Sequence, residues 1–131
     1  MDAEGQFHIY DYKTGVPPSR DVQMHFDKQL LLEAAIAERA GFGDLPPAPV
    51  ARAVFIGLGS GKTEEVAPIE TETPERVWDE FQHLIRDYFG DKLGFTARRA
   101  PQTTRDEGDY DHLARFGEWD VSDKPNPEVV G

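Results

Sequence analysis

One segment decides the fold of this chain: Phe7-His8-Ile9-Tyr10-Asp11-Tyr12-Lys13-Thr14-Gly15. The alternation of its side chains predicts a strand that ends at Thr14-Gly15. One face of this strand carries Phe7, Ile9 and Asp11, and the other carries His8, Tyr10 and Tyr12. Asp11 and Lys13 are two residues apart and therefore project from the same face. A carboxylate beside an ammonium suits a divalent metal at Asp11, with Lys13 placed to stabilise a developing negative charge.

The structural alternative for Asp11 and Lys13 is an ion pair on an edge strand. Such a same-face pair contributes about 0.2–1 kcal/mol and serves no function beyond that. Taken without a family, the residues favour this alternative.

Residues 19–40 predict a helix. Ser19 or Asp21 can cap its N-terminus, because a short oxygen side chain accepts from the free N–H groups of the first turn. A broad apolar face follows, and Gly41 ends the helix. Gln29 lies on this helix, where an exposed or capping glutamine is the ordinary interpretation.

Residues 50–58 predict a strand with apolar residues on both faces, which suits a sheet covered on two sides. Gly57-Leu58-Gly59-Ser60-Gly61-Lys62-Thr63 comes next and resembles a phosphate-binding loop, but Ile56 stands where that motif has its first glycine. The acids that follow repel phosphate, and Pro68 disfavours the helix that the motif requires. We therefore predict a hairpin turn at Gly59-Ser60-Gly61-Lys62, between two strands.

A second helix is predicted to begin with Thr73 as N-cap and Pro74 at the first helical position. Its apolar residues recur at helical spacing and form one stripe, which we expect to lie in the core: Val77, Trp78, Phe81, Leu84, Ile85, Tyr88 and Phe89. Gly90 ends the helix.

The chain beyond the second helix lacks a strong periodicity. Arg98 and Arg99 form the one local basic spot, on an arm that we expect to be extended. The segment 109–119 is dense in large side chains. We expect it to be docked, with Tyr110 and Trp119 as anchors.

Three segments together resemble a known family. I-x-D-Y-K-T-G at residues 9–15 resembles the third motif of the RecB-like branch of the PD-(D/E)XK nucleases. Gln29-Leu30-Leu31-Leu32-Glu33-Ala34 resembles the glutamine motif on the helix that follows. Residues 109–115, with Glu118-Trp119 after them, resemble the end of AddB subunits of AddAB helicase–nucleases. The resemblance covers about residues 1 to 120.

The resemblance implies an α/β fold of the restriction-endonuclease-like type, a mixed sheet flanked by helices. It implies that Asp11 binds Mg²⁺ or Mn²⁺, with the backbone carbonyl of Tyr12 as a further ligand. It also implies that Lys13 stabilises charge on the phosphate and that Gln29 orients Lys13 or the strand. The parent protein would be a DNA exonuclease in double-strand break repair and recombination, with an AddA-type helicase subunit as partner.

One departure from the family limits what this chain does alone. The family site needs an earlier acidic residue on the strand that pairs with the Asp-Tyr-Lys strand, and residues 1–6 predict a turn instead. We therefore expect a piece of a longer protein that lacks the N-terminal helix and the first strand or strands. Its partial nuclease domain would occupy residues 1–120, with a flexible tail at 121–131. The isolated chain is expected to be inactive.

Net charge and composition further restrict the classes of protein to which this chain can belong. The net charge is −11, from 14 Lys and Arg against 25 Asp and Glu. DNA binding usually needs a basic surface, so we expect the chain by itself to bind DNA poorly. The chain has 0 Cys and cannot hold a cysteine-bound iron–sulfur cluster. No apolar run approaches the ~20 residues of a membrane span, and we expect a cytoplasmic protein without membrane contact.

The alternative function is non-catalytic. In this interpretation the chain is an interaction or structural module whose acidic surface binds a protein partner. A strand edge left exposed could also pair with a second copy and give a homodimer.

Overall fold

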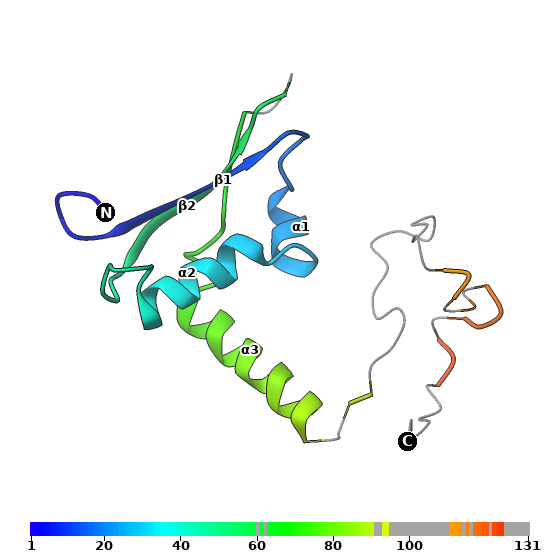
Figure 1. Ribbon diagram of the computed structural model, residues 1–131. Helices are drawn as coiled ribbons and strands as arrows, with labels where there is room; N and C mark the ends of the chain where they lie inside the picture. The colour runs from blue at the N-terminus through cyan, green and yellow to red at the C-terminus, as the bar shows by residue number, and fades with distance from the viewer. Residues whose placement is uncertain are drawn as a thin grey trace. The chain divides into compact units, whose positions relative to one another are not determined.

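The structure is a computed structural model, and it describes residues 1–59, 61, 63–90, 93–94, 111–113, 115, 117–120 and 122–124. The elements in chain order are β1 (Phe7–Lys13), α1 (Arg20–His25), α2 (Gln29–Ala40), β2 (Val50–Gly57), β3 (Glu64–Val66) and α3 (Pro74–Phe89) (Figure 1). The chain divides into two compact units, Met1–Leu84 and Ile85–Gly131.

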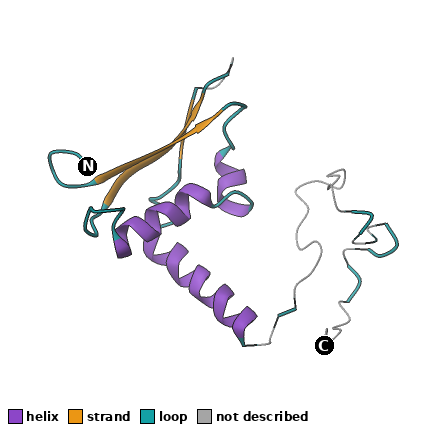
Figure 2. Ribbon diagram, viewed as in Figure 1, coloured by secondary structure: helices purple, strands orange, loops and turns teal. Residues whose placement is uncertain are grey.

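The three strands form a mixed sheet in the order β1–β2–β3. β1 runs parallel to β2, with Asp11 opposite Phe55, and β2 runs antiparallel to β3, with Ile56 opposite Glu64. The chain passes from β1 to β2 through α1 and α2, and α2 packs on one face of the sheet (Figure 2). This is the α/β architecture that the sequence predicts, a mixed sheet with helices.

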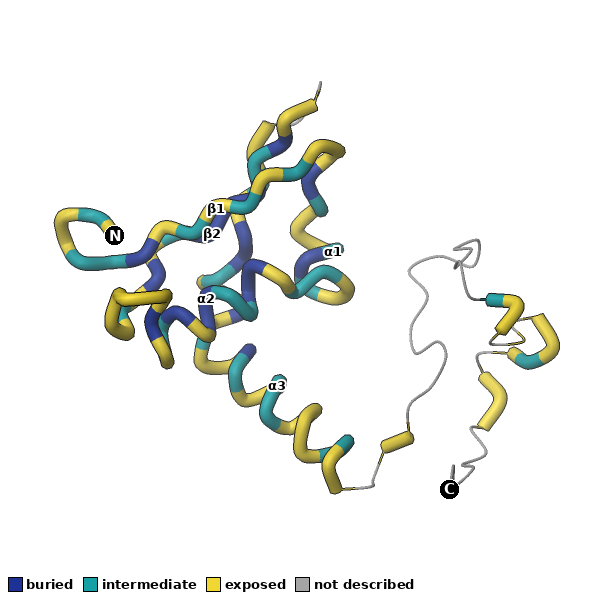
Figure 3. Tube along the Cα trace, in the orientation of Figure 1, coloured by how far each residue is buried: buried dark blue, intermediate teal, exposed yellow. Residues whose placement is uncertain are grey.

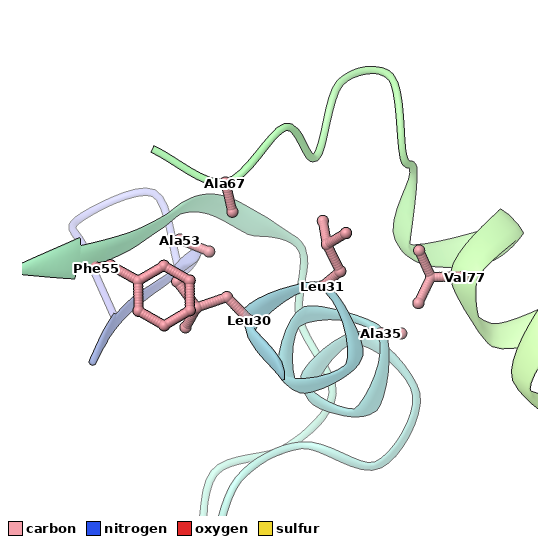
Figure 4. Close-up of a cluster of buried hydrophobic side chains, with 7 residues drawn as sticks. All are labelled: Leu30, Leu31, Ala35, Ala53, Phe55, Ala67 and Val77. Carbon is pink, nitrogen blue, oxygen red and sulfur yellow. The ribbon is translucent and has the colours of Figure 1, made fainter. Parts of the chain in front are cut away.

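The hydrophobic core lies between α2 and the sheet. Leu30 and Leu31 of α2 and Phe55 of β2 are almost completely buried, and Ala53 and Val77 belong to the same cluster. Figure 4 shows the side chain of Leu30 against the Phe55 ring. Burial of each large side chain contributes about 1.5–3 kcal/mol, so this contact between α2 and β2 fixes the helix on the sheet.

Helices cover one face of the sheet in the described part of the chain. Val54 is buried on the opposite face, where its partners in the register are Tyr10 of β1 and Val66 of β3. Tyr10 and Val66 remain 48% and 45% exposed. Within the described residues, helices therefore cover one face of the sheet only (Figure 2), although Val54 is buried on the second face.

The helix predicted over residues 19–40 is two helices. Ser19 caps α1 as expected, but the N–H groups of Phe26 and Asp27 both donate to the Val22 carbonyl and end α1 there. The Asp27 carboxylate then accepts from the N–H of Gln29, at 3.3 Å between Oδ1 and N. This local side-chain bond competes with the helix. As a result, Gln29 is the first residue of α2 instead of a mid-helix residue.

The predicted hairpin is confirmed, since β2 and β3 pair antiparallel on either side of residues 59–62. The N–H of Gly57 donates to the Thr63 carbonyl at 2.9 Å, and the chain continues directly into β3. A phosphate-binding loop requires a helix at this position, so that alternative is wrong. Ser60 and Lys62 lie outside the described residues.

The start of α3 also agrees with the sequence. Oγ1 of Thr73 accepts from the N–H of Arg76 at 3.3 Å, and Pro74 is the first helical residue. Thr73 satisfies a donor that the first turn leaves free, and Pro74 has no donor to satisfy.

The apolar stripe of α3 is not core along its length, which corrects the prediction. Val77 is buried and Trp78 packs against the same cluster, whereas Leu84, Ile85 and Phe89 are exposed (Figure 3). The helix axis advances ~1.5 Å per residue. Only its first turns therefore meet the core that α2 forms with the sheet.

The second unit contains turns in its described part. Arg115 forms an ion pair with Glu118, Trp119 is half-buried and Leu113 is exposed. The basic spot at Arg98 and Arg99, the anchor Tyr110 and most of the predicted tail lie outside the described residues.

Candidate functional site

Asp11 and Lys13 lie at the end of β1, on the face that α2 covers. Both side chains are half-buried, and Oδ2 of Asp11 lies 2.8 Å from Nζ of Lys13. This oxygen is itself buried and accepts no well-aligned hydrogen bond. The predicted strand faces are confirmed, since Phe7 is buried while His8, Tyr10 and Tyr12 are exposed.

A second element reaches Lys13 from 16 residues further along the chain. Nζ of Lys13 donates to Oε1 of Gln29 at 3.0 Å. The break between α1 and α2 makes this contact possible, because it places Gln29 at the start of a helix that is packed on the sheet. The structure therefore brings together Asp11, Lys13 and Gln29, the three side chains that the resemblance singles out.

The ring of Phe55 completes the surroundings of Lys13. Its centroid lies 5.0 Å from Nζ, and the ring is buried. Phe55 is the partner of Asp11 in the parallel register of β1 and β2. The pairing of these two strands therefore sets the position of the Phe55 ring relative to Asp11 and Lys13. A cation over an aromatic face is attracted by the negative face of the ring, by about 0.5–1 kcal/mol at an exposed site.

The Gln29 side chain has a further partner on its own helix. Nε2 of Gln29 donates to Oε1 of Glu33 at 3.0 Å. A continuous chain of polar contacts thus runs from Asp11 through Lys13 and Gln29 to Glu33.

The carboxylates around Lys13 hold it in its charged form. The adjoining Asp11 carboxylate raises the pKa of Lys13 above its ordinary value, and the charges of Asp27 and Glu33 add to the effect against the opposing desolvation. Lys13 is therefore a cation at neutral pH. A raised pKa favours the charged ammonium, the form that can stabilise negative charge.

The carbonyl of Tyr12 is directed away from β2. The Lys13 carbonyl accepts from the N–H of Leu58 at 2.8 Å, so the backbone carbonyl of Lys13 points toward β2. Carbonyls alternate along a strand, so that of Tyr12 points to the other edge of β1. Among the described strands β1 has a neighbour on one side only, and the Tyr12 carbonyl lies on the free side.

The fit of a divalent metal to this site is partial. Asp11 offers a carboxylate oxygen without a well-aligned donor, which suits Mg²⁺, an ion that commonly takes one or two carboxylates and keeps several waters. Within the described residues, however, no three His, Cys, Asp or Glu side chains gather into a metal-binding group. The described residues thus supply one side-chain ligand and no complete set.

The acids that precede β1 do not complete the site. The Asp2 carboxylate accepts from the N–H groups of Glu4 and Gln6 and contacts Nε2 of His8 at 2.8 Å. The predicted turn at residues 1–6 is thereby confirmed. It lies at the opposite end of β1 from Asp11, too far away to share an ion.

Sequence reasoning missed two contributors to the Lys13 surroundings, Asp27 and Phe55. Asp27 stands two residues before Gln29, a spacing typical of a local side-chain turn, and this signal was available. Phe55 had no such signal, because its position under Lys13 depends on the register between β1 and β2.

Comparison with known proteins identifies one family. Residues 1–109 match the PD-(D/E)XK nuclease superfamily. No curated protein and no solved structure matches the chain. No helix in the described part of the chain is long and apolar enough to cross a membrane.

Proposed function

The chain belongs to the PD-(D/E)XK nuclease superfamily, and we propose that Asp11, Lys13 and Gln29 form part of a metal-dependent phosphodiester-cleaving centre. The observation that carries the proposal is the position of Lys13, which contacts Asp11 of its own strand and Gln29 of a packed helix. An isolated ion pair between Asp11 and Lys13 on the surface would form without the contact from α2.

Each residue has a separate task in this centre. Asp11, with the carbonyl of Tyr12, would hold Mg²⁺ or Mn²⁺, the ions that the superfamily generally uses. A bound ion would supply Lewis-acid chemistry at the phosphate. Lys13 stabilises the negative charge that develops on the phosphate oxygens, and Gln29 keeps the Lys13 ammonium in place.

The finer proposal concerns the substrate and the partners. We propose that the chain is part of an AddB-like DNA exonuclease that acts in double-strand break repair and recombination, beside an AddA-type helicase subunit. Support comes from the glutamine motif at residues 29–34 and from the segment 109–119. With a net charge of −11, the chain would depend on partner surfaces for its hold on DNA.

The experiment that tests the metal site is an Mn²⁺ titration followed by NMR. Substoichiometric Mn²⁺ is expected to broaden the resonances of residues 11–13 first, because a paramagnetic ion broadens its near neighbours. Asp11→Asn should abolish this local effect, whereas Asp21→Asn, which removes one exposed acid on α1, should leave it intact. Broadening spread over the acidic surface and unchanged by Asp11→Asn would contradict the proposal.

Digestion of linear DNA provides the second arm. With Mg²⁺ or Mn²⁺ the chain alone is expected to leave DNA intact, because the described residues offer one side-chain ligand only. Digestion that disappears in both Asp11→Ala and Lys13→Ala would prove the centre complete within the 131 residues. Digestion that persists in Asp11→Ala would count against the proposed site.

A protein-interaction module is the second candidate function. The observation that favours it is the position of β1, which is an edge strand of the described sheet. An unpaired edge can accept a strand from another chain, including a second copy of this protein. The oligomeric state tests this candidate.

A further inference from the structure

We propose that Glu33 is a positioning residue of the candidate site, which orients the Gln29 amide so that its oxygen faces Lys13. The inference rests on the proposed function and deepens it. It assigns a task to a carboxylate that accepts a hydrogen bond from Nε2 of Gln29.

The donor and acceptor properties of the three groups allow one arrangement of their contacts. A lysine ammonium only donates, and an ionised carboxylate only accepts. The amide of Gln29 lies between them, with Lys13 3.0 Å from Oε1 and Glu33 3.0 Å from Nε2. Rotation of this amide by half a turn would place donor against donor and acceptor against acceptor. Glu33 and Lys13 together therefore permit one orientation.

The position of Glu33 on α2 makes this contact rigid. Residues four apart lie on the same helix face, so Glu33 stands one turn above Gln29. The helix beneath them is anchored, since Leu30, Leu31 and Ala34 are completely or almost completely buried. Asp27 holds the backbone N–H of Gln29 at the start of the same turn.

The loss of Glu33 would free the Gln29 amide without changing the core. Gln29 is exposed and Glu33 only half-buried, so neither supports the buried cluster. Lys13 alone would then orient the amide, the flipped orientation would become more populated, and the contact between Oε1 and the Lys13 ammonium would weaken. A site with this defect folds normally but places its cation loosely.

The test measures the hydrogen exchange of the Lys13 ammonium with water by ¹⁵N NMR at low temperature in the full chain. Glu33→Ala is expected to speed this exchange about tenfold. The Gln29 amide is then no longer held, and the Lys13 ammonium loses the equivalent of one hydrogen bond of ordinary net strength. Glu33→Gln keeps the shape but can accept or donate, and should give a smaller increase. Glu70→Gln, which neutralises an exposed acid outside the site, should cause no change.

A double-mutant cycle separates positioning from direct attraction between charges. If Glu33 acts through Gln29, Glu33→Ala adds nothing to the exchange rate once Gln29→Ala is present. An equal increase in both backgrounds would overturn the proposal and assign the effect to the charge of Glu33. An unchanged exchange rate in Glu33→Ala would also overturn it.

The outcome is independent of nuclease activity. The exchange measurement needs neither metal nor DNA, so the positioning of Lys13 can fail while Mn²⁺ still binds at Asp11. Conversely, loss of the Mn²⁺ effect would remove the proposed function and leave the contact between Glu33 and Gln29 standing.

Discussion

Lys13 is the residue on which the functional interpretation depends. An ion pair with Asp11 alone is what any acid and base two residues apart on a strand can form, and it is worth little. The additional contacts with Gln29 and Phe55 come from α2 and β2, which lie far along the chain. Two elements that are distant in the chain therefore converge on one ammonium.

A glycine sets the exit from α2. Gly41 has φ +77° and ψ −164°, a region of backbone conformation that is essentially restricted to glycine. A Cβ built at this position would lie 2.1 Å from the Leu45 carbonyl oxygen and 2.8 Å from the Pro46 carbonyl carbon. Both are backbone atoms, which cannot rotate away.

We therefore expect Gly41→Ala to lower the free energy of unfolding by about 2–4 kcal/mol, the sum of backbone strain and overpacking. Urea denaturation measures it. Gly15→Ala is the matched control, since a Cβ at Gly15 meets nothing within 4 Å. A Gly41→Ala variant as stable as Gly15→Ala would mean that the loop after α2 adopts another path.

At the scale of elements, four charged side chains join the start of α2 to the start of α3. Lys28 lies 3.4 Å from Glu72 and 3.0 Å from Glu80, and Arg76 lies 3.0 Å from each of the same two carboxylates. Glu72 is buried and depends on both cations. This ion cluster holds the first turns of α3 near Val77, where the helix meets the core.

The ion cluster makes stability depend on pH. A hydrogen bond from Lys28, with a further one from Arg76, holds the pKa of Glu80 below its ordinary value of 4.5. A depressed folded-state pKa adds stability that is present above pH 4.5 and is lost as the pH falls through the folded-state value. When the free energy of unfolding is measured by urea denaturation between pH 3 and 7, Glu80→Gln should therefore lose less of it on acidification than the natural chain does.

Glu75→Gln is the control for this prediction. It removes the same charge from the first turn of α3 but lies outside the ion cluster. If Glu80→Gln and Glu75→Gln flatten the pH dependence equally, the acid sensitivity comes from net charge and not from the cluster.

At the scale of the whole molecule, charge and sheet edge act in opposite directions. The net charge of −11 opposes association between two copies, whereas β1 offers an edge without a described neighbour. The exposed faces of Tyr10 and Tyr12 lie along the same strand. The balance between charge repulsion and strand pairing decides whether the chain is a monomer or a dimer formed through β1.

The interaction candidate predicts a dimer, and light scattering at physiological salt would then give about twice the monomer mass of 14.7 kDa. The backbone of Tyr10 points to the free edge, by the alternation that directs Lys13 toward β2. Tyr10→Pro should therefore remove a donor from that edge and yield a monomer, whereas Tyr10→Ala should remain dimeric. A monomeric natural chain would exclude pairing between two copies.

Local patterns in the sequence determined much of this protein. The alternation in residues 7–13 placed Asp11 and Lys13 on one face, and the caps Ser19 and Thr73 marked where helices begin. The glycines after β2 marked the hairpin. These features depend on neighbours in the chain, whose spacing and backbone preferences the sequence states directly.

Only the tertiary structure decided how those parts meet. The contact between Lys13 and Gln29, the Phe55 ring beneath the ammonium and the short buried portion of α3 all involve segments that are distant in the chain. A periodic stripe says that a helix has an apolar face, but not how much core it will find. A glutamine on a helix becomes part of a site only when strand register and helix packing bring the lysine to its oxygen.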